Sequence, residues 1–255
     1  MHSLKKRIKT GELTIGSWIT IGHSAIVEIM ANAGFDWLVL DMEHSAITLD
    51  QAQQLIQVIE LCGISPLVRV GENNPNIIKR VMDAGAHGVV VPMVNSKDDA
   101  ERAVHAVKYP PRGTRGVGLA RAQGYGLEFN RYKKWVNEES IVIVQIEHIK
   151  ATANLDEIFS VPDIDGFIVG PYDLSASIGR PGEFSHPEVE KALAKVLKFS
   201  KKNNVTSGFH VIPPEANKVH EAIKKGYRFV GFSLDTLFLG IKCREQVHNI
   251  KEMKL

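Results

Sequence analysis

The sequence predicts an α/β fold, a single (β/α)₈ barrel in which eight parallel strands alternate with helices. Three observations lead to this prediction. The chain has 255 residues, which is close to the usual size of one barrel domain. Short apolar runs rich in Val, Ile and Phe recur eight times, and most are followed by a stretch with helical spacing. The prediction therefore assigns residues 1–255 to one domain.

The eight apolar runs are nearly continuous in hydrophobicity rather than alternating, as expected for parallel strands that are covered on both faces. The runs are Thr14–Ile19, Asp36–Asp41, Pro66–Val70, His87–Pro92, Ile141–Glu147, Asp165–Gly170, Val205–His210 and Phe229–Leu234. An open doubly wound sheet is the alternative. No Gly-rich phosphate-binding motif follows the first run, which favours the closed barrel.

Capping signals define the predicted helices. Asn74–Ala84 starts with Asn-Pro and is followed by Gly, while Ser96–Val107 starts with a Ser N-cap and has acidic residues in its first turn. The same pattern predicts helices over His186–Asn203 and Pro213–Lys225, the second of which closes on Gly226. These segments supply part of the outer layer of the barrel.

One connection is much longer than the others. Lys108–Ser140, after the fourth strand unit, contains Pro110-Pro111 and several glycines, and its pattern predicts little regular structure. A connection of this length inside a compact barrel usually has a function. We expect a lid or a contact between subunits.

Composition and charge exclude several classes of protein. Hydrophobic residues make up 44% and charged residues 24% of the chain, an ordinary balance for a globular domain, and the net charge is +2. Lys198, Lys201 and Lys202 are interpreted as a solvated helix face, because no aromatic stacking platform accompanies them, so no nucleic-acid partner is expected. No apolar run approaches the roughly 20 residues that span a bilayer, and residues 1–13 lack the apolar core of a signal peptide.

Two cysteines are present, Cys62 and Cys243. They lie far apart in the sequence and have no spacing typical of a metal site. The sequence predicts buried free thiols, which suit a reducing compartment, and hence a cytoplasmic location.

Polar residues stand at the carboxyl ends of several predicted strands. A barrel brings these ends together at one mouth, where barrel enzymes have their active sites. Five side chains from four strand ends are therefore expected to converge: Asp41, His44, Arg69, Glu147 and Asp173.

The fifth run carries an unusual carboxylate. Period-2 alternation places Ile143, Gln145 and Glu147 on one face, and a buried carboxylate needs a compensating cation. With Asp173, Glu147 would form a hard oxygen site for Mg²⁺ or Mn²⁺. A structural ion pair between Glu147 and Arg69 is the alternative, and the spacing does not separate the two.

Two further polar residues suggest chemistry. The guanidinium of Arg69 suits a carboxylate or a developing oxyanion, because its charge is fixed and its donors form a planar fork. His44 is a candidate general base, because histidine is the side-chain type most often used to take up and release protons in catalysis, although it would equally fit a loop as a capping histidine.

Several long segments in the same order resemble one family of enzymes. They are Gly16-Ser17-Trp18, Phe35-Asp36-Trp37, Asp41-Met42-Glu43-His44, Pro66-Leu67-Val68-Arg69, Val91-Pro92-Met93-Val94, Tyr109-Pro110-Pro111-Arg112-Gly113-Thr114-Arg115-Gly116, Gln145-Ile146-Glu147, Gly170-Pro171-Tyr172-Asp173-Leu174-Ser175 and Leu234-Asp235-Thr236. Over nearly the whole chain, the sequence resembles the class II pyruvate-dependent aldolases of the HpcH/HpaI family. This resemblance implies a barrel of the phosphoenolpyruvate/pyruvate type.

The resemblance implies a metal and a substrate site. Glu147 and Asp173 are similar to the two protein ligands of a divalent cation, Mg²⁺, Mn²⁺ or Co²⁺. Gln145 resembles a substrate contact. The backbone amides of Tyr172 and Asp173 resemble the pocket for the carboxylate of a 2-oxo acid, in agreement with anion binding at a helix start.

The same resemblance implies roles for four more residues. Arg69 is similar to the group that stabilises the enolate or alkoxide charge. His44 matches the base, and Asp83 matches the acid that raises the proton affinity of this base. Trp18 resembles an aromatic residue that lines the aldehyde side.

The implied reaction is the cleavage of a 4-hydroxy-2-oxo acid to pyruvate and an aldehyde, or its reverse, through a metal-bound pyruvate enolate. No lysine Schiff base is required. The family implies a homo-oligomer, a hexamer. The apolar residues of Thr236–Val247 exceed the need of one barrel helix, so residues 236–255 are expected to pack on a neighbouring subunit.

Some residues depart from the family pattern. Met42 stands where relatives often have Gly, and the insert at residues 118–126 differs from that of the aldolases that cleave dicarboxylates. His210 follows the seventh run, where an apolar residue facing the aldehyde is expected. The reaction class is therefore carried over, and the aldehyde substrate is not.

Other functions remain as alternatives. An oxaloacetate decarboxylase or an acyl-CoA lyase would pass through the same enolate, although the extended basic surface that a CoA diphosphate needs is not evident. A barrel that binds a carboxylate ligand without catalysis is a third possibility, because the barrel fold alone implies no function.

Overall fold

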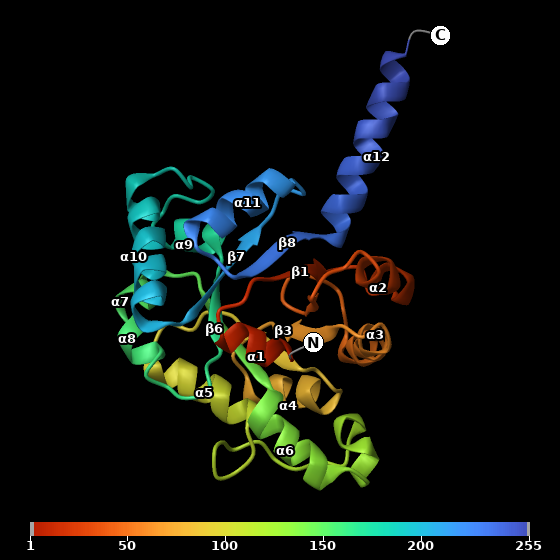
Figure 1. The fold of residues 1–255 in the computed structure, drawn as a ribbon, viewed down its shortest axis with the longest axis vertical. Helices are drawn as coiled ribbons and strands as arrows, with labels where there is room; N and C mark the ends of the chain where they lie inside the picture. Colours follow the sequence, from red (N-terminus) through yellow and green to blue (C-terminus); the bar gives the residue numbers. More distant parts are fainter. Residues whose placement is uncertain (1–2, 254–255) are drawn as a thin grey trace.

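The computed structural model describes residues 3–253 and confirms the predicted closed barrel (Figure 1). Every strand pairs in parallel with its neighbours in the sequence, and β8 closes on β1. The strands are β1 (Thr14–Ile19), β2 (Trp37–Asp41), β3 (Ser65–Arg69), β4 (Gly88–Val91), β5 (Ile141–Ile146), β6 (Gly166–Val169), β7 (Thr206–Val211) and β8 (Phe229–Leu234). Each coincides with a predicted run to within two residues at either end.

The inside of the barrel is filled by side chains and closed at one end by a short helix. Val39, Leu67 and Val90 belong to one fully buried apolar cluster in this interior. Leu4 and Ile8 of α1 (Leu4–Lys9) join the cluster. Because this packed interior leaves no room for a ligand, a substrate site has to lie at a mouth of the barrel.

Helices form the outer layer and bury a second, larger core against the strands. Their bounds are α2 (Ser24–Ala31), α3 (Leu49–Leu61), α4 (Pro75–Asp83), α5 (Lys97–Val107), α7 (Ile149–Ala153), α8 (Leu155–Ile158), α9 (Pro171–Ser177), α10 (Pro187–Asn203) and α11 (Ala216–Lys225). The predicted N-caps Asn74 and Ser96 accept hydrogen bonds from backbone amides of the first turn. Helix α11 begins three residues later than predicted, after Pro213-Pro214, and ends at Gly226 with a φ of 115°.

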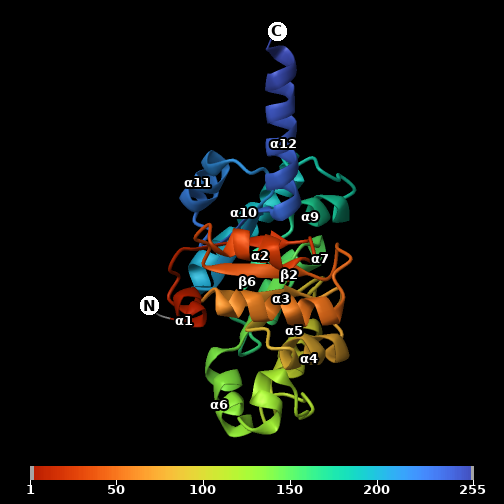
Figure 2. The same ribbon diagram turned by 90° about the vertical axis from the view of Figure 1, so that its right-hand side faces the viewer.

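The long connection is more regular than the sequence predicted. It contains a 3₁₀ segment, η1 (Arg121–Gly126), and the helix α6 (Phe129–Glu139), which lies at the lower end of the molecule (Figures 1 and 2). Tyr132 and Val136, four residues apart on α6, pack with Tyr109 in a small apolar cluster. The prediction of a largely irregular loop was wrong because these few apolar positions suffice to anchor a helix.

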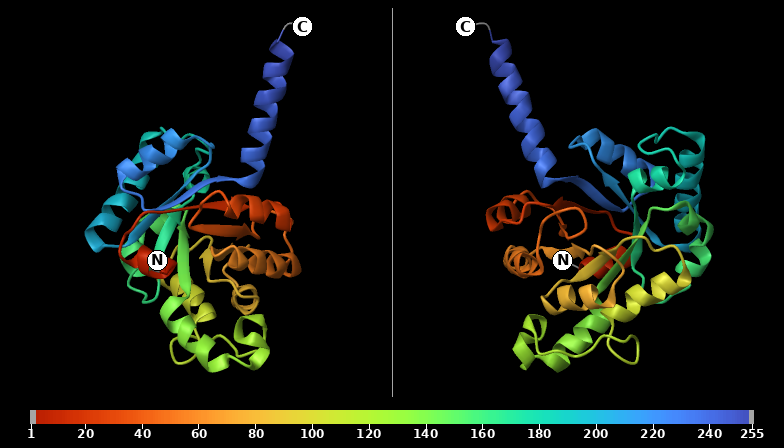
Figure 3. Two further views of the ribbon diagram at one scale, coloured as in Figure 1. Left: turned by 45° about the vertical axis from the view of Figure 1, so that its right-hand side comes forward. Right: turned by 180° about the vertical axis from the view of Figure 1, so that it is seen from behind.

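Both thiols are exposed, and the prediction that they are buried is wrong. Cys62 is the C-cap of α3, where the chain turns toward β3. Cys243 lies on α12 (Asp235–Glu252), which extends away from the barrel (Figures 1 and 3). Cys62 follows the last turn of α3, and Cys243 stands on a helix whose one buried residue is Asp235, so no other part of the described chain covers either side chain.

Helix α12 has an unusual position. Asp235 is its only buried residue, and it receives hydrogen bonds from the amides of Thr20 and Ile21 at 2.9 and 2.8 Å. In the part of the chain from residue 3 to 253, no helix combines the length and the apolarity that a membrane crossing requires.

The contact between β1 and β2 permits no side chain at position 16. A Cβ atom on Gly16 would lie 2.0 Å from Cδ2 of the buried Trp37. We expect Gly16→Ala to lower the free energy of unfolding by about 1–3 kcal/mol, because the indole has no space to retreat. Urea unfolding followed by tryptophan fluorescence measures this change.

Gly240 provides the matched control. A Cβ atom at this position of α12 would meet nothing within 4 Å, so Gly240→Ala should leave stability unchanged or raise it by up to about 1 kcal/mol. Equal effects of the two substitutions would contradict the packing argument.

Candidate active site

A pocket of about 370 Å³ opens at the carboxyl ends of the strands. It is lined by Trp18, Thr20, Asp41, His44, Arg69, Gln145, Glu147, Ile168, Val169, Gly170, Pro171, Tyr172, Asp173, His210, Ile212 and Leu234. Every residue that the sequence singled out for a site is among them, except Asp83. The five residues of the strand-end argument therefore line one pocket, together with Trp18, Gln145 and Tyr172, which the family resemblance named.

A bidentate ion pair fixes the arginine of the pocket. Nε and Nη2 of Arg69 donate to the two carboxylate oxygens of Asp41 at 3.0 and 2.6 Å, across the β2–β3 pairing. Burial would raise the pKa of Asp41, but hydrogen bonds from Arg69 and from the amides of His44 and Glu43 hold it below its usual value. The guanidinium also lies over the ring of Trp18, 4.8 Å from the centroid. Arg69 is thus held in place from two sides.

Glu147 does not pair with Arg69, which was the structural alternative, since the ion-pair partners of Arg69 in residues 3–253 are Asp41 and Glu43. Oε1 of Glu147 accepts a hydrogen bond of 2.7 Å from the amide of Met93, and Oε2 accepts one from Gln145. Burial, together with the negative charges of Glu43 and Asp173, raises the pKa of Glu147 to about 7.

Met93 is a functional residue that the sequence analysis missed. Its φ of 54° lies in the left-handed region, which is unfavourable for a side chain of this kind. In this backbone conformation the amide of Met93 donates its hydrogen bond to Oε1 of Glu147. The role of a backbone amide leaves no trace in the side-chain pattern, so the residue type gave no signal.

Asp173 belongs to the strand–helix unit that follows the strand before Glu147. It lies in the first turn of α9, directly after β6, and Gly170 stands between the two carboxylates. A Cβ atom on Gly170 would be 2.9 Å from Oε2 of Glu147 and 3.7 Å from Oδ2 of Asp173. A residue larger than glycine would intrude on the space that the two carboxylates share.

Glu43 adds further negative charge to the mouth. Its Oε2 is buried without a hydrogen-bond partner, although Nη1 of Arg69 lies 3.2 Å away. Burial, Asp41 and Asp173 raise its pKa to about 7, against the lowering effect of Arg69. Three carboxylates, Asp41, Glu147 and Asp173, therefore line the pocket with one guanidinium, and Glu43 lies next to that guanidinium.

This donor set fits a divalent cation. In residues 3–253, no group of three or more His, Cys, Asp and Glu side chains is arranged to hold a metal ion, so the chain would supply two carboxylates, Glu147 and Asp173. Mg²⁺ is commonly held by one or two carboxylates, with water and substrate oxygens completing the octahedron. Oε2 of Glu43 is buried without a hydrogen-bond partner, and burial raises the pKa values of Glu43 and Glu147, so a bound cation would offset negative charge that is costly here.

His44 lies at the rim, with most of its side chain exposed. Its Nε2 is 3.9 Å from Oε2 of Glu43. Asp83, its expected partner, is not in the pocket. It ends α4 on the opposite side of the barrel and pairs with Arg115 at 2.5 Å. Within one chain the structure therefore does not bring Asp83 to His44, because α4 runs antiparallel to the strands and carries its last residue away from the mouth.

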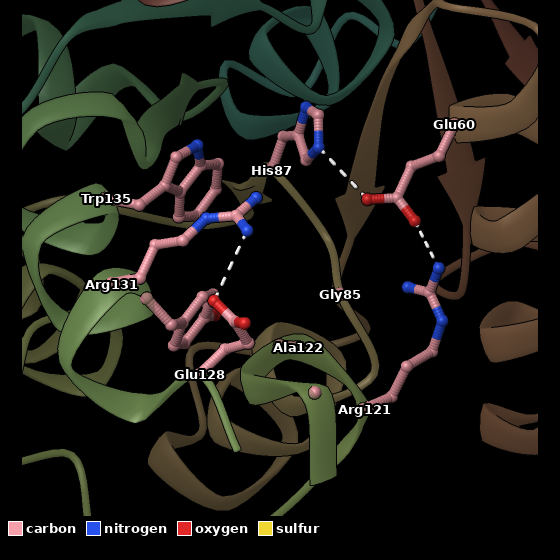
Figure 4. A pocket seen from close by; sticks show the side chains of 10 residues that line it. Glu60, Gly85, His87, Arg121, Ala122, Glu128, Arg131 and Trp135 are labelled. Carbon is pink, nitrogen blue, oxygen red and sulfur yellow. Dashed lines mark hydrogen bonds and ion pairs between the residues drawn. The ribbon is translucent and has the colours of Figure 1, made fainter. Parts of the chain in front are cut away.

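A second hollow, of about 520 Å³, lies at that opposite end (Figure 4). Glu60 there pairs with Arg121 and lies 3.2 Å from Nε2 of His87, and Arg131 pairs with Glu128 at 3.3 Å. Each of these charged groups already has a partner of opposite sign in the wall. The hollow lacks the unbalanced charge that distinguishes the pocket at the strand ends.

Comparison with known proteins identifies the family. Residues 14–239 match the model of the HpcH/HpaI aldolase/citrate lyase family. The chain belongs to this family. The resemblance stated from the sequence motifs is thereby confirmed.

Similar proteins include aldolases. The 2-keto-3-deoxy-L-rhamnonate aldolases of Escherichia coli and Shigella sonnei are 36% identical over 238 residues, which is 92% of this chain and 88% of theirs. A family member of known structure from Burkholderia cenocepacia superposes with a TM-score of 0.92 at 32% identity, over 98% of this chain and 99% of that one. An HpcH/HpaI aldolase from Desulfitobacterium hafniense gives 0.90 at 31%, over 100% and 98%.

The raised pKa of Glu147 predicts how stability depends on pH and metal. Because its pKa is about 7 rather than 4.5, the folded state binds the proton more tightly than the unfolded chain. The associated stability is complete below about pH 4.5 and is lost as the pH rises through 7. In EDTA, thermal unfolding should occur at a lower temperature at pH 8 than at pH 5, and Mg²⁺ should reverse the loss at pH 8.

Glu147→Gln is the diagnostic variant, since it keeps the shape and removes the charge. In EDTA at pH 8 it should be more stable than the unsubstituted chain, by on the order of 2–3 kcal/mol, and it should gain little from Mg²⁺. Equal stabilisation of both proteins by Mg²⁺ would exclude Glu147 as a ligand.

Proposed function

We propose that this protein is a divalent-metal-dependent aldolase that cleaves a 4-hydroxy-2-oxo acid to pyruvate and an aldehyde and catalyses the reverse addition. The observation that carries the proposal is that carboxylate oxygens of Glu147 and Asp173 both lie within 4 Å of the point where a Cβ on Gly170 would stand. The same pocket holds an arginine that is fixed by Asp41. Membership of the HpcH/HpaI family and likeness to named aldolases support this reaction class.

Glu147 and Asp173 would hold the cation, Mg²⁺, Mn²⁺ or Co²⁺. When bound, a cation of this kind supplies a Lewis acid for the keto oxygen of the substrate. Gln145 donates to Glu147 and keeps that carboxylate oriented, while its position in the pocket also offers an amide to the substrate. The amides of Tyr172 and Asp173 at the start of α9 would receive the carboxylate of the 2-oxo acid.

Arg69 would stabilise the charge that develops during cleavage. When the bond between C3 and C4 breaks, the electron pair passes to the 2-oxo group and gives the enolate of pyruvate. A guanidinium that is already fixed by Asp41 and Trp18 does not have to reorganise as this charge appears, which is the main source of electrostatic catalysis.

His44 is the proposed base. It would remove the proton of the 4-hydroxyl group, so that the aldehyde carbonyl forms as the carbon–carbon bond breaks. Its position at the rim of the pocket, close to Glu43, allows it to exchange protons with solvent. The enolate then takes a proton at C3 to give pyruvate.

The relatives suggest a substrate class. A 2-keto-3-deoxy sugar acid, the kind of compound named for the similar aldolases, is a 4-hydroxy-2-oxo acid, and its cleavage between C3 and C4 leaves pyruvate and a hydroxy aldehyde. We propose this class for the present protein. Pyruvate would occupy the carboxylate side of the pocket and the aldehyde the side of Trp18.

We also propose that α12 binds a second copy of the chain and that the protein is a homo-oligomer, a hexamer by resemblance to the family. Leu239, Ile241, Val247 and Ile250 are exposed along this helix, and the helix leaves its own barrel (Figure 3). Exposed apolar side chains in this number on one helix are typical of a surface that another chain covers.

The reaction is tested by exchange of the methyl protons of pyruvate in deuterated water, followed by NMR. We expect exchange with Mg²⁺ or Mn²⁺ and none in EDTA. Arg69→Lys should lower the exchange rate by at least about 100-fold, because an ammonium cannot keep both hydrogen bonds to Asp41. Arg102→Lys, at an exposed surface pair, is the control and should leave the rate unchanged.

Three results would contradict the proposed reaction. Exchange that persists in EDTA would exclude the role of the cation. Exchange without formation of an aldol product from any aldehyde, together with rapid decarboxylation of oxaloacetate, would favour the decarboxylase instead. Absence of turnover and of metal in the purified protein would favour a binding function.

The role of α12 is tested by Leu239→Glu combined with Val247→Glu. Lys242→Glu on the same helix is the control, because it changes the net charge by the same amount without replacing an apolar side chain. Light scattering should report an oligomer for the unsubstituted chain and the control, and a smaller species for the double variant. An unchanged mass for the double variant would exclude α12 as the contact.

A further inference from the structure

His210 is a titratable residue of the pocket to which the proposed mechanism gives no role. It lies on β7, opposite Gly231 of β8 in the parallel register, and its ring packs on Trp18 with centroids 5.1 Å apart. It therefore stands on the side of the pocket that we assign to the aldehyde. The sequence pattern predicted an apolar residue here, so a polar ring requires an explanation.

The hydrogen bonds of the ring fix its tautomer. Nε2 of His210 lies 3.1 Å from the carbonyl oxygen of Ser233, and because a carbonyl can only accept, Nε2 must carry the hydrogen. Burial lowers the pKa of His210 to about 4, and the charge of Arg69 adds to this effect. The ring is therefore neutral near pH 7, and Nδ1 bears a free lone pair.

This lone pair is available to a ligand. In residues 3–253, no hydrogen bond is made by Nδ1 of His210. The Cδ2 edge of the ring faces β8, 3.4 Å from the point where a Cβ on Gly231 would lie. Nδ1 is on the opposite edge and thus turns away from β8. Of the neighbours of the ring in the pocket, Ile212 and Leu234 have no donor in their side chains. Nε1 of Trp18 is a donor without a hydrogen-bond partner, but it lies 3.2 Å from the same point on Gly231 and so stands on the Cδ2 side of the ring.

We propose that His210 determines aldehyde specificity by accepting, at Nδ1, a hydrogen bond from a hydroxyl group next to the aldehyde carbon. The inference rests on the proposed function and names the residue that would recognise the hydroxyl group of the proposed hydroxy aldehyde. An aldehyde without this hydroxyl group would leave the lone pair of Nδ1 desolvated and unpaired, which disfavours its binding.

The experiment compares two aldehydes that differ by one hydroxyl group, glycolaldehyde and acetaldehyde, in Mg²⁺-dependent addition to pyruvate. The measured quantity is the kcat/KM for glycolaldehyde divided by that for acetaldehyde. A loss of activity that affects both aldehydes equally cancels in this ratio. We expect His210→Leu to lower the ratio about tenfold, because one hydrogen bond between neutral groups is lost. His210→Asn, whose amide can present an oxygen near the position of Nδ1, should retain most of the preference.

His220→Leu, on the exposed face of α11, is the matched control and should keep the ratio of the unsubstituted chain. A ratio that is the same in His210→Leu and the control would overturn the proposal, as would a loss of the preference in His210→Asn equal to that in His210→Leu. Exchange of pyruvate protons in the unsubstituted chain separates this failure from a failure of the proposed function. If that exchange is absent, both proposals fall.

Discussion

Unbalanced negative charge at one mouth of the barrel is the constraint on which the site depends. Asp41 is neutralised by Arg69, but Glu43, Glu147 and Asp173 have no cation of their own in the described chain apart from the shared guanidinium. Burying carboxylates without compensation is costly. The cation that we propose between Glu147 and Asp173 would offset this charge, and the closed barrel holds the strands that carry the carboxylates in register.

The apolar cluster that stabilises the barrel and the residues of the proposed site lie at different levels along the barrel axis. The interior cluster and α1 close one end of the barrel, so the packing that stabilises the molecule does not compete with the chemistry at the other. Strain is located near the site, where Met93 adopts a positive φ and supplies its amide to Glu147. Such local strain persists only because the surrounding strands determine the backbone path.

The pocket itself has two halves of different character. Carboxylates and the start of α9 face one side, while Trp18, Ile212 and Leu234 face the other. Arg69 connects them, since it bonds to Asp41 and also lies over Trp18. This division would suit the proposed substrate, which has a charged oxo-acid end and a less polar aldehyde end, and the proposed role of His210 would add one acceptor to the second half.

Sequence alone determined the eight strands, the closed barrel and the convergence of Asp41, Arg69, Glu147 and Asp173, because burial patterns are local and the carboxyl ends of parallel strands meet by topology. Tertiary structure decided what depends on contacts between distant segments. It separated Asp83 from His44, ordered α6 through Tyr109 and Tyr132, exposed both thiols, and paired Arg69 with Asp41 rather than Glu147. No sequence spacing encodes these choices, since each is set by which surfaces meet in three dimensions.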